Sequence, residues 1–303
     1  MITKIVSFAE IIGRFDLAPE KAIEYFTSKG LRPTFSWLDM IGEEHDAAFT
    51  VAKMMDADLL KTVQERLTLA LEQGSTLEDF KRELIPTLQE SGWWGKKDVI
   101  DPKTGLVIKA QLGSASRLET IFRSNLQSAY AVGRWDMIER NKQYAPYLMY
   151  DAVDDNRTRA AHAKLDEVVR PVDDAFWSSH YPPLGYNCRC SVVQMSAEDL
   201  SGYGLKVSPP QKVKTRMWRN PRTGLKRPVP EGVDPGWDNN PAKARQTTLQ
   251  QVKADKLAQL PIAARKAYSV AESAAQAVRK RFMAQVAIAL TAISHLFDPD
   301  DVE

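Results

Sequence analysis

The 303-residue sequence lacks the short motifs that identify the common enzyme classes. It has no glycine-rich phosphate-binding loop, no G-x-S-x-G nucleophile motif and no H-E-x-x-H zinc-protease motif. It also has no run of about 18 apolar residues, so we expect no membrane span. These absences argue against the common hydrolases and nucleotide-binding proteins, and we expect no small-molecule substrate. They leave rarer enzyme classes open.

Neither sign of charge is in excess over the whole chain. The sequence has 41 basic and 39 acidic residues, a net charge of +2 at pH 7. Nucleic-acid binding would therefore depend on a local basic patch. Because 44% of the residues are hydrophobic, the chain can bury a core, and its length suits two modest domains or one domain with extensions.

Cysteine is scarce, with only Cys188 and Cys190 in the chain. One residue separates them, which is too short a loop for an unstrained disulfide. The first 20 residues show no basic n-region, continuous apolar region or cleavage site, so we expect no signal peptide. These features favour synthesis in a reducing cytoplasm.

Most of the chain shows the apolar spacing of helices. Capping boxes predict two helix starts, Ser75 with Glu78 and Ser116 with Glu119. A buried stripe is expected along the helix after the second box, formed by Leu118, Ile121, Phe122, Leu126, Ala129, Tyr130, Gly133 and Ile138. The predicted helices are residues 17–30, 35–73, 75–90, 116–140 and 262–297, the last with an apolar face that needs a partner.

Few strands are predicted. The turn sequences D-P-K-T-G and N-P-R-T-G indicate two separate hairpins, over 99–110 and 216–227. Strands at 146–153 and 189–196 flank a block with His162 on a short helix.

The predicted fold class is α+β and predominantly helical. It has a helical N-terminal part, a small mixed central unit with few strands, an extended basic arm and a C-terminal amphipathic helix. The predicted domain ranges are 1–112, 113–200 and 201–303.

Both cysteines and two of the four histidines lie between residues 154 and 190. Zinc prefers four thiolate or imidazole ligands in a tetrahedron. His162, Cys188 and Cys190 could supply three ligands, and His180, or an acid such as Asp155 or Asp166, the fourth. The alternative is that the cysteines are small, half-buried strand residues and that His162 hydrogen-bonds a loop. If zinc binds, we expect a structural role, because few acids and bases stand nearby to activate a water.

Charged residues are dense in the same block. One interpretation is a catalytic, nuclease-like cluster; the one we favour is an ion-pair lattice in which arginine forks hold carboxylates. Asp155 is expected to cap the His162 helix. The residues of this motif are Asp154, Asp155, Arg157, Arg159, Asp166, Asn187 and Arg189.

A basic arm follows, with eight Lys or Arg and no acidic residue in 206–227. It could neutralise phosphates while Trp218 stacks on bases. It could instead dock on an acidic protein neighbour, or be a solvated loop. The candidate binding residues are Lys206, Lys212, Lys214, Arg216, Trp218, Arg219, Arg222, Lys226 and Arg227.

Two motifs resemble a known signature. D-x-R-T-R-x-x-H-x-x-L-D at 155–166 and P-P-x-G-x-N-C-R-C at 182–190 resemble the F-like minor head proteins, also called head morphogenesis proteins, of Mu-type tailed phages. Segments 18–53, 92–95 and 229–241 extend the resemblance over most of residues 10–245. Two departures are visible: Glu167 replaces a common glycine, and Arg159 and His162 replace a C-x-x-C pair of some relatives.

This resemblance implies a non-enzymatic protein that joins the procapsid in few copies near the portal and is needed for head morphogenesis. It implies portal, scaffold or capsid proteins as partners, with double-stranded DNA as a further contact, and a place in the virion head after synthesis in the bacterial host cytoplasm. On this interpretation His162, Cys188 and Cys190 hold the central fold together. The rival interpretation is a metal-dependent nuclease or toxin-like enzyme centred on His162 and the N-C-R-C element.

Overall fold

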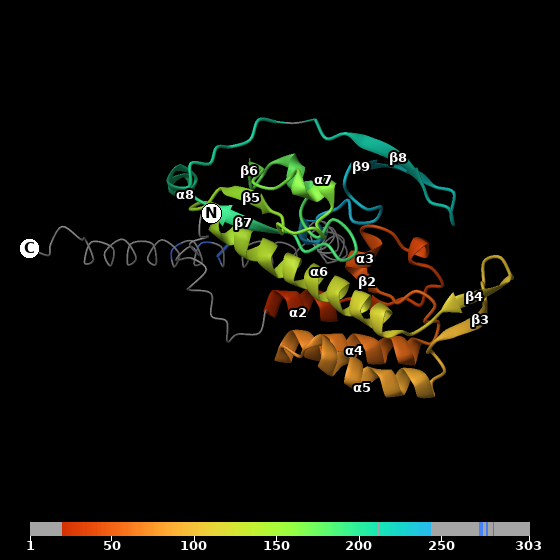
Figure 1. Cartoon of the computed structure of the whole chain (residues 1–303). Helices are drawn as coiled ribbons and strands as arrows, with labels where there is room; N and C mark the ends of the chain where they lie inside the picture. Colours follow the sequence, from red (N-terminus) through yellow and green to blue (C-terminus); the bar gives the residue numbers. More distant parts are fainter. Residues whose placement is uncertain (1–19, 211, 244–272, 275–276, 278–280, 282–303) are drawn as a thin grey trace, which may run out of the picture. The chain divides into compact units, whose positions relative to one another are not determined.

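The computed structural model describes residues 20–210, 212–243, 273–274, 277 and 281 (Figure 1). The chain divides into two compact units, residues 1–246 and 247–303. All the elements with bounds given below belong to the first unit. The helix predicted at 262–297 lies outside the described residues apart from Ser273, Ala274, Ala277 and Arg281, which are helical.

Four helices form the main layer of the first unit. They are α2 (Glu20–Thr27), α4 (Ala57–Gln73), α5 (Leu77–Glu90) and α6 (Ala115–Asn141), and their apolar faces share one core (Figure 1). Helices α2 and α6 pack against each other at Gly133, where an added Cβ would be in van der Waals contact with Ala22, 3.4 Å from its backbone nitrogen. The helical character predicted for the N-terminal part is therefore confirmed.

Both capping boxes were placed wrongly from the sequence. Helix α5 is capped by Thr76, whose hydroxyl accepts from the backbone of Asp79, and not by Ser75 with Glu78. Helix α6 is capped by Ser114 and not by Ser116. Tyr130, expected in the buried stripe, is 40% exposed. The error arises because a hydroxyl residue one or two positions away, Thr76 or Ser114, caps the helix instead.

The helix predicted over 35–73 begins only at residue 57, where Asp56 caps α4. Short elements fill the preceding segment. The segment contains β1 (Gly30–Leu31), η1 (Trp37–Asp39), α3 (Glu44–Ala47) and β2 (Ala48–Phe49), with β1 parallel to β2. The chain reverses at Gly42, whose φ of 66° is left-handed, and this interrupts the helical periodicity.

A three-stranded antiparallel sheet packs beside α6 (Figure 1). Its order is β6 (Val169–Pro171), β5 (Tyr147–Asp151), β7 (Ser191–Met195). Leu148 and Tyr150 alternate toward the core and are fully buried. The two strands predicted at 146–153 and 189–196 are thus confirmed as β5 and β7, whereas β6 is too short to be recognised from its sequence.

Both predicted hairpins are present. Strands β3 (Lys96–Ile100) and β4 (Val107–Gln111) form the first, and β8 (Thr215–Arg219) and β9 (Lys226–Pro230) the second. The remaining short helices are α7 (Ala160–Ala163), η2 (Ala175–Ser178) and α8 (Ala197–Gly202).

The fold class is α+β and predominantly helical, as predicted. One core cluster draws residues from all three predicted domain ranges, among them Phe26, Leu148 and Val233. The boundaries near 112 and 200 stay predictions. In the part of the chain that the structure describes, no helix is both long enough and apolar enough for a membrane crossing.

Candidate functional site

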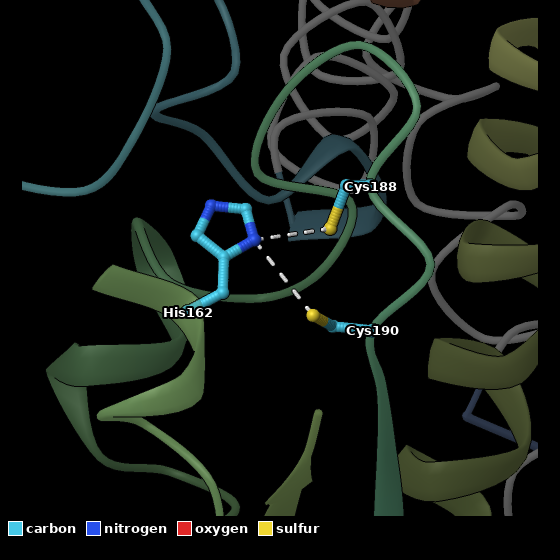
Figure 2. Close-up of side chains that lie close together, drawn as sticks. All are labelled: His162, Cys188 and Cys190. Atoms are coloured by element: carbon cyan, nitrogen blue, oxygen red, sulfur yellow. Dashed lines mark hydrogen bonds between the residues drawn. The ribbon is translucent and has the colours of Figure 1, made fainter. Parts of the chain in front are cut away.

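His162, Cys188 and Cys190 converge next to the start of β7 (Figure 2). His162 projects from the short helix α7, which follows Arg159. The cysteines lie on the segment that enters β7, after Asn187 turns the chain with a left-handed φ of 59°. His162 and Cys188 are buried and Cys190 is half-buried.

The geometry of the three side chains suits a tetrahedral metal. The Nδ1 atom of His162 lies 3.7 Å from each sulfur, and the three ligand atoms lie within 4.8 Å of one another. Zinc with ordinary bond lengths would place a nitrogen and a sulfur about 3.6 Å apart and two sulfurs about 3.8 Å apart. The two nitrogen–sulfur distances therefore match those that zinc requires.

The second ring nitrogen of His162 fixes the orientation of the imidazole. Its Nε2 atom lies 3.0 Å from the carbonyl oxygen of Gly232 and would donate to it. That tautomer leaves a lone pair on Nδ1, which faces the two sulfurs (Figure 2). Metal-bound histidines commonly have such a carbonyl partner. The same arrangement also suits a thiol donating to Nδ1 without a metal.

The fourth ligand expected from the sequence is not brought to this cluster. His180 Nδ1 lies 2.9 Å from Ser179 Oγ, and its ring stacks on Phe176. Burial lowers the pKa of His180 to about 4. Asp155 pairs with Arg189, and Asp166 accepts from the backbone of Ala152. Within the described ranges, no fourth histidine, cysteine or acid joins the group.

Tyr150 is a neighbour that the sequence analysis missed. It lies on β5, is fully buried, and its hydroxyl has no hydrogen-bond partner among the residues described. Burial raises the pKa of Tyr150 above its usual range, and the nearby Cys188 and Cys190 add to the effect. Strand alternation over 147–151 was the available signal that this side chain points inward.

Each of the two thiols shifts the pKa of the other. The hydrogen bond with Cys188 lowers the pKa of the Cys190 thiol, and His162 contributes in the same direction. The same hydrogen bond, with burial, raises the pKa of Cys188. One thiolate is thus favoured, the form in which cysteine binds a metal.

The neighbouring charges form the ion-pair lattice predicted from the sequence. Arg189 holds the Asp155 carboxylate with two bonds of 2.6 and 2.7 Å, and this lowers the pKa of Asp155 below its usual range. Arg159 pairs with Asp234 at 3.2 Å and donates to the carbonyl of Tyr186. The expectation that Asp155 caps α7 was wrong, because it accepts instead from the backbone of Arg157.

The basic arm is only partly available for a partner. Arg222 forms two bonds with Asp101, of 2.6 and 2.9 Å, and pairs with Asp39. Arg227 pairs with Asp238. Trp218 is half-buried. The other candidate side chains are exposed: Lys206, Lys212, Lys214, Arg216, Arg219 and Lys226.

A cavity of about 620 Å³ lies elsewhere in the first unit, lined partly by Trp37, Tyr186 and Trp237. Its acid, Asp46, accepts from Tyr25 and Asn239, and burial raises its pKa to about 6. No local sequence pattern indicates this cavity, because its walls come from four separate segments, within 25–53, 108–128, 183–186 and 235–241.

Comparison with known proteins finds a similar family over part of the chain. Residues 61–193, from α4 to β7, match the family described as Phage Mu protein F like protein. This region, which is less than half of the chain, is similar to the Phage Mu protein F like family. The matched region contains His162, Cys188 and Cys190, so the resemblance inferred from the two motifs is confirmed.

Two curated relatives match a similar length of chain. Protein F of Escherichia phage Mu, which carries the name capsid assembly protein, is 43% identical over 192 residues. The FluMu F protein of a Mu-like prophage in Haemophilus influenzae is 37% identical over 175 residues. These matches cover 63% and 58% of this chain but only 44% and 41% of the relatives. The chain thus spans less than half of their length, and no solved structure matches it.

Proposed function

We propose that this chain is a phage head protein that acts in capsid assembly and resides in the virion. The observation that carries the proposal is the 43% identity over 192 residues with a phage Mu protein named for capsid assembly. The site agrees with this role. His162 is 2% exposed with Nε2 at a backbone carbonyl, and the surrounding charges are held in ion pairs. A buried, paired cluster fits a structural element better than a nuclease centre.

The partners that we propose are the portal and other head proteins. The chain would bind these partners through surfaces outside the ion-pair lattice, above all through the basic arm. Double-stranded DNA is the second candidate partner, favoured by the exposed Lys212, Lys214, Arg216 and Arg219. Phosphate binding by these four side chains would weaken steeply with added salt.

The experiment removes the gene from the phage or prophage that encodes the chain and restores it on a plasmid. We expect few normal heads without the gene, recovery with it, and the chain in purified heads by mass spectrometry. Normal heads in its absence, together with no chain in purified virions, would contradict the proposal.

We also propose that His162, Cys188 and Cys190 bind a structural zinc ion. The fit of their 3.7 Å separations to zinc geometry supports this, as does the carbonyl partner of His162. The fourth position would be filled by the Tyr150 hydroxyl or by water. Such a metal would join α7 to the segment that enters β7 and to the loop that contains Gly232.

Metal content tests this proposal. Elemental analysis should give about one zinc per chain in the wild type and in His180→Asn, which is the matched control because His180 lies outside the cluster. Zinc and folding stability should both be lost in Cys188→Ser/Cys190→Ser. Zinc lost with folding intact would favour the catalytic alternative instead. No zinc in the wild type would reduce the cluster to packing and hydrogen bonds.

A further inference from the structure

The two hairpins have turns of the same construction. Gly105 and Gly224 have left-handed φ angles of 70° and 78°. In each turn the glycine nitrogen donates over 2.8 Å to the carbonyl of the first turn residue, Asp101 or Asn220. In each, the side chain of that first residue also accepts from the backbone two positions later. Two distant segments, 119 residues apart along the chain, therefore form matching loops.

The two turns contact each other through an ion pair and hydrogen bonds. Arg222, in the second turn, forks onto the carboxylate of Asp101 in the first, and Lys103 donates to the carbonyl of Arg222. The hydrogen bonds from Arg222 lower the pKa of Asp101 to about 2. Asn220 then ties the pair to the body of the protein through the carbonyl of Leu38, at 3.0 Å. The turns of the β3–β4 and β8–β9 hairpins are thus joined, and we call the two hairpins together the composite surface.

The composite surface exposes several large apolar side chains to solvent. Five large apolar side chains on the hairpins are 63–72% exposed, more than any other in the part of the chain that the structure describes. They are Ile100, Leu106, Val107, Met217 and Leu225. Leu106 and Leu225 occupy the same position in the two turns. Large apolar side chains exposed on two joined hairpins favour an interaction surface.

The same surface carries positive charge. Residues 96–111 and 212–230 contain 11 basic and 2 acidic residues. Arg222 and Arg227 are neutralised by Asp39, Asp101 and Asp238, which leaves nine basic residues against Asp98. A partner must therefore combine apolar recesses with an acidic rim. Phosphates would complement the charges but would leave leucine and isoleucine exposed, which favours a protein over DNA.

We propose that the paired hairpin tips dock on an acidic, apolar-pocketed surface of another head protein. This inference rests on the proposed function and names the surface that serves it. Arg222 is the positioning residue, because it holds the two tips in one arrangement. Leu106 and Leu225 are the anchors, and the exposed lysines and arginines around them supply complementary charge.

The test uses the full chain and three variants. Leu106→Ser/Leu225→Ser removes the anchors, Lys214→Gln/Arg219→Gln/Lys226→Gln removes charge, and Arg222→Lys keeps charge but loses the fork. Met55→Ser/Met137→Ser is the matched control, because these methionines are 51% and 57% exposed outside the hairpins. Affinities are measured for the purified portal and capsid proteins of the same phage, and for a mixed-sequence DNA duplex.

We expect the wild type to bind one of these proteins, the anchor and charge variants to bind it at least tenfold more weakly, and the control to bind as the wild type does. Arg222→Lys should weaken binding severalfold. Unchanged affinity in the anchor variant would overturn the proposal. So would a wild type that binds the duplex but none of the head proteins.

Purified heads separate this inference from the proposed function. If the anchor variant enters heads at the wild-type level, the hairpin surface is not the docking site, although the protein is still a head component. If the wild-type chain itself is missing from heads, the proposed function fails.

Discussion

Acidification should destabilise the protein through His180. This side chain is 5% exposed, its ring stacks on Phe176 with centroids 4.5 Å apart, and Ser179 Oγ lies at its Nδ1 atom. A proton on this ring would be buried without a carboxylate partner, so burial lowers the pKa from 6.5 to about 4. The folded state therefore favours the neutral imidazole.

Proton linkage gives the sign and the size of this change in stability. Between pH 6.5 and 4 the unfolded chain binds the proton and the folded chain does not, so stability is complete above pH 6.5 and falls as the pH decreases. At pH 5 the two pKa values give a loss of about 2 kcal/mol from His180 alone. His45, whose pKa burial and Lys29 also lower to about 4, adds a similar loss that is common to wild type and variant.

Urea unfolding, followed by tryptophan fluorescence at pH 7.5 and pH 5, measures this effect. The wild type should lose about 2 kcal/mol more than His180→Gln over this interval. Zinc content, measured at both pH values, should be equal in the two proteins because His180 lies outside the cluster. Equal losses within about 0.5 kcal/mol would refute the assignment of His180 as a buried neutral residue.

Three further substitutions test packing, hydrogen bonding and ionisation elsewhere in the first unit. Gly113→Ala should destabilise by about 2 kcal/mol, because its Cβ would lie 2.6 Å from the Trp93 carbonyl oxygen, whereas Gly30→Ala, with no atom within 4 Å, should be near neutral in urea titrations. Tyr181→Phe should cost about 1 kcal/mol, since the buried hydroxyl donates to the Ala131 carbonyl at 2.8 Å, and Tyr144→Phe, 59% exposed, should cost nothing measurable. Burial raises the pKa of Asp46 to about 6, so above that pH the folded protein holds a buried carboxylate at a cost in free energy. Asp46→Asn should therefore stabilise by about 1–3 kcal/mol at pH 8. The gain should vanish near pH 4 in thermal melts followed by circular dichroism.

The parts of the fold predicted from the sequence are those encoded by local chemistry. Glycine at a fixed place in a D-P-x-T-G or N-P-x-T-G turn specifies each hairpin, and regular apolar spacing specifies the helix at 57–73. Residues 35–56 were predicted as helix because spacing alone does not register the turn at Gly42. The predicted cap positions were wrong because several hydroxyl residues lie within reach of each helix start.

In the candidate site, the sequence predicted the cysteines and the histidine but not the residues that surround them. Two cysteines and a histidine in one block are conspicuous in a chain that has so few of them, and the structure does bring His162, Cys188 and Cys190 together. The carbonyl of Gly232 carries no residue-type signal, and Tyr150 is one of nine tyrosines. The pairing of Arg222 with Asp101 depends on how two distant hairpins meet, which no local pattern reports.

Contacts between the two ends of the first unit have a consequence for how the protein is made. Asn239 donates to Asp46 across 193 residues of sequence, and Asn220 donates to the Leu38 carbonyl across 182. A ribosome adding about 5–20 residues per second would leave the early segment waiting roughly 10–40 s for these partners. The region around η1 and α3 thus completes its packing only after translation has passed residue 240. A nascent chain released before that point would lack the loop that contains Trp237 and Asn239. The aromatic residues of the cavity wall would then stay exposed to chaperones and proteases.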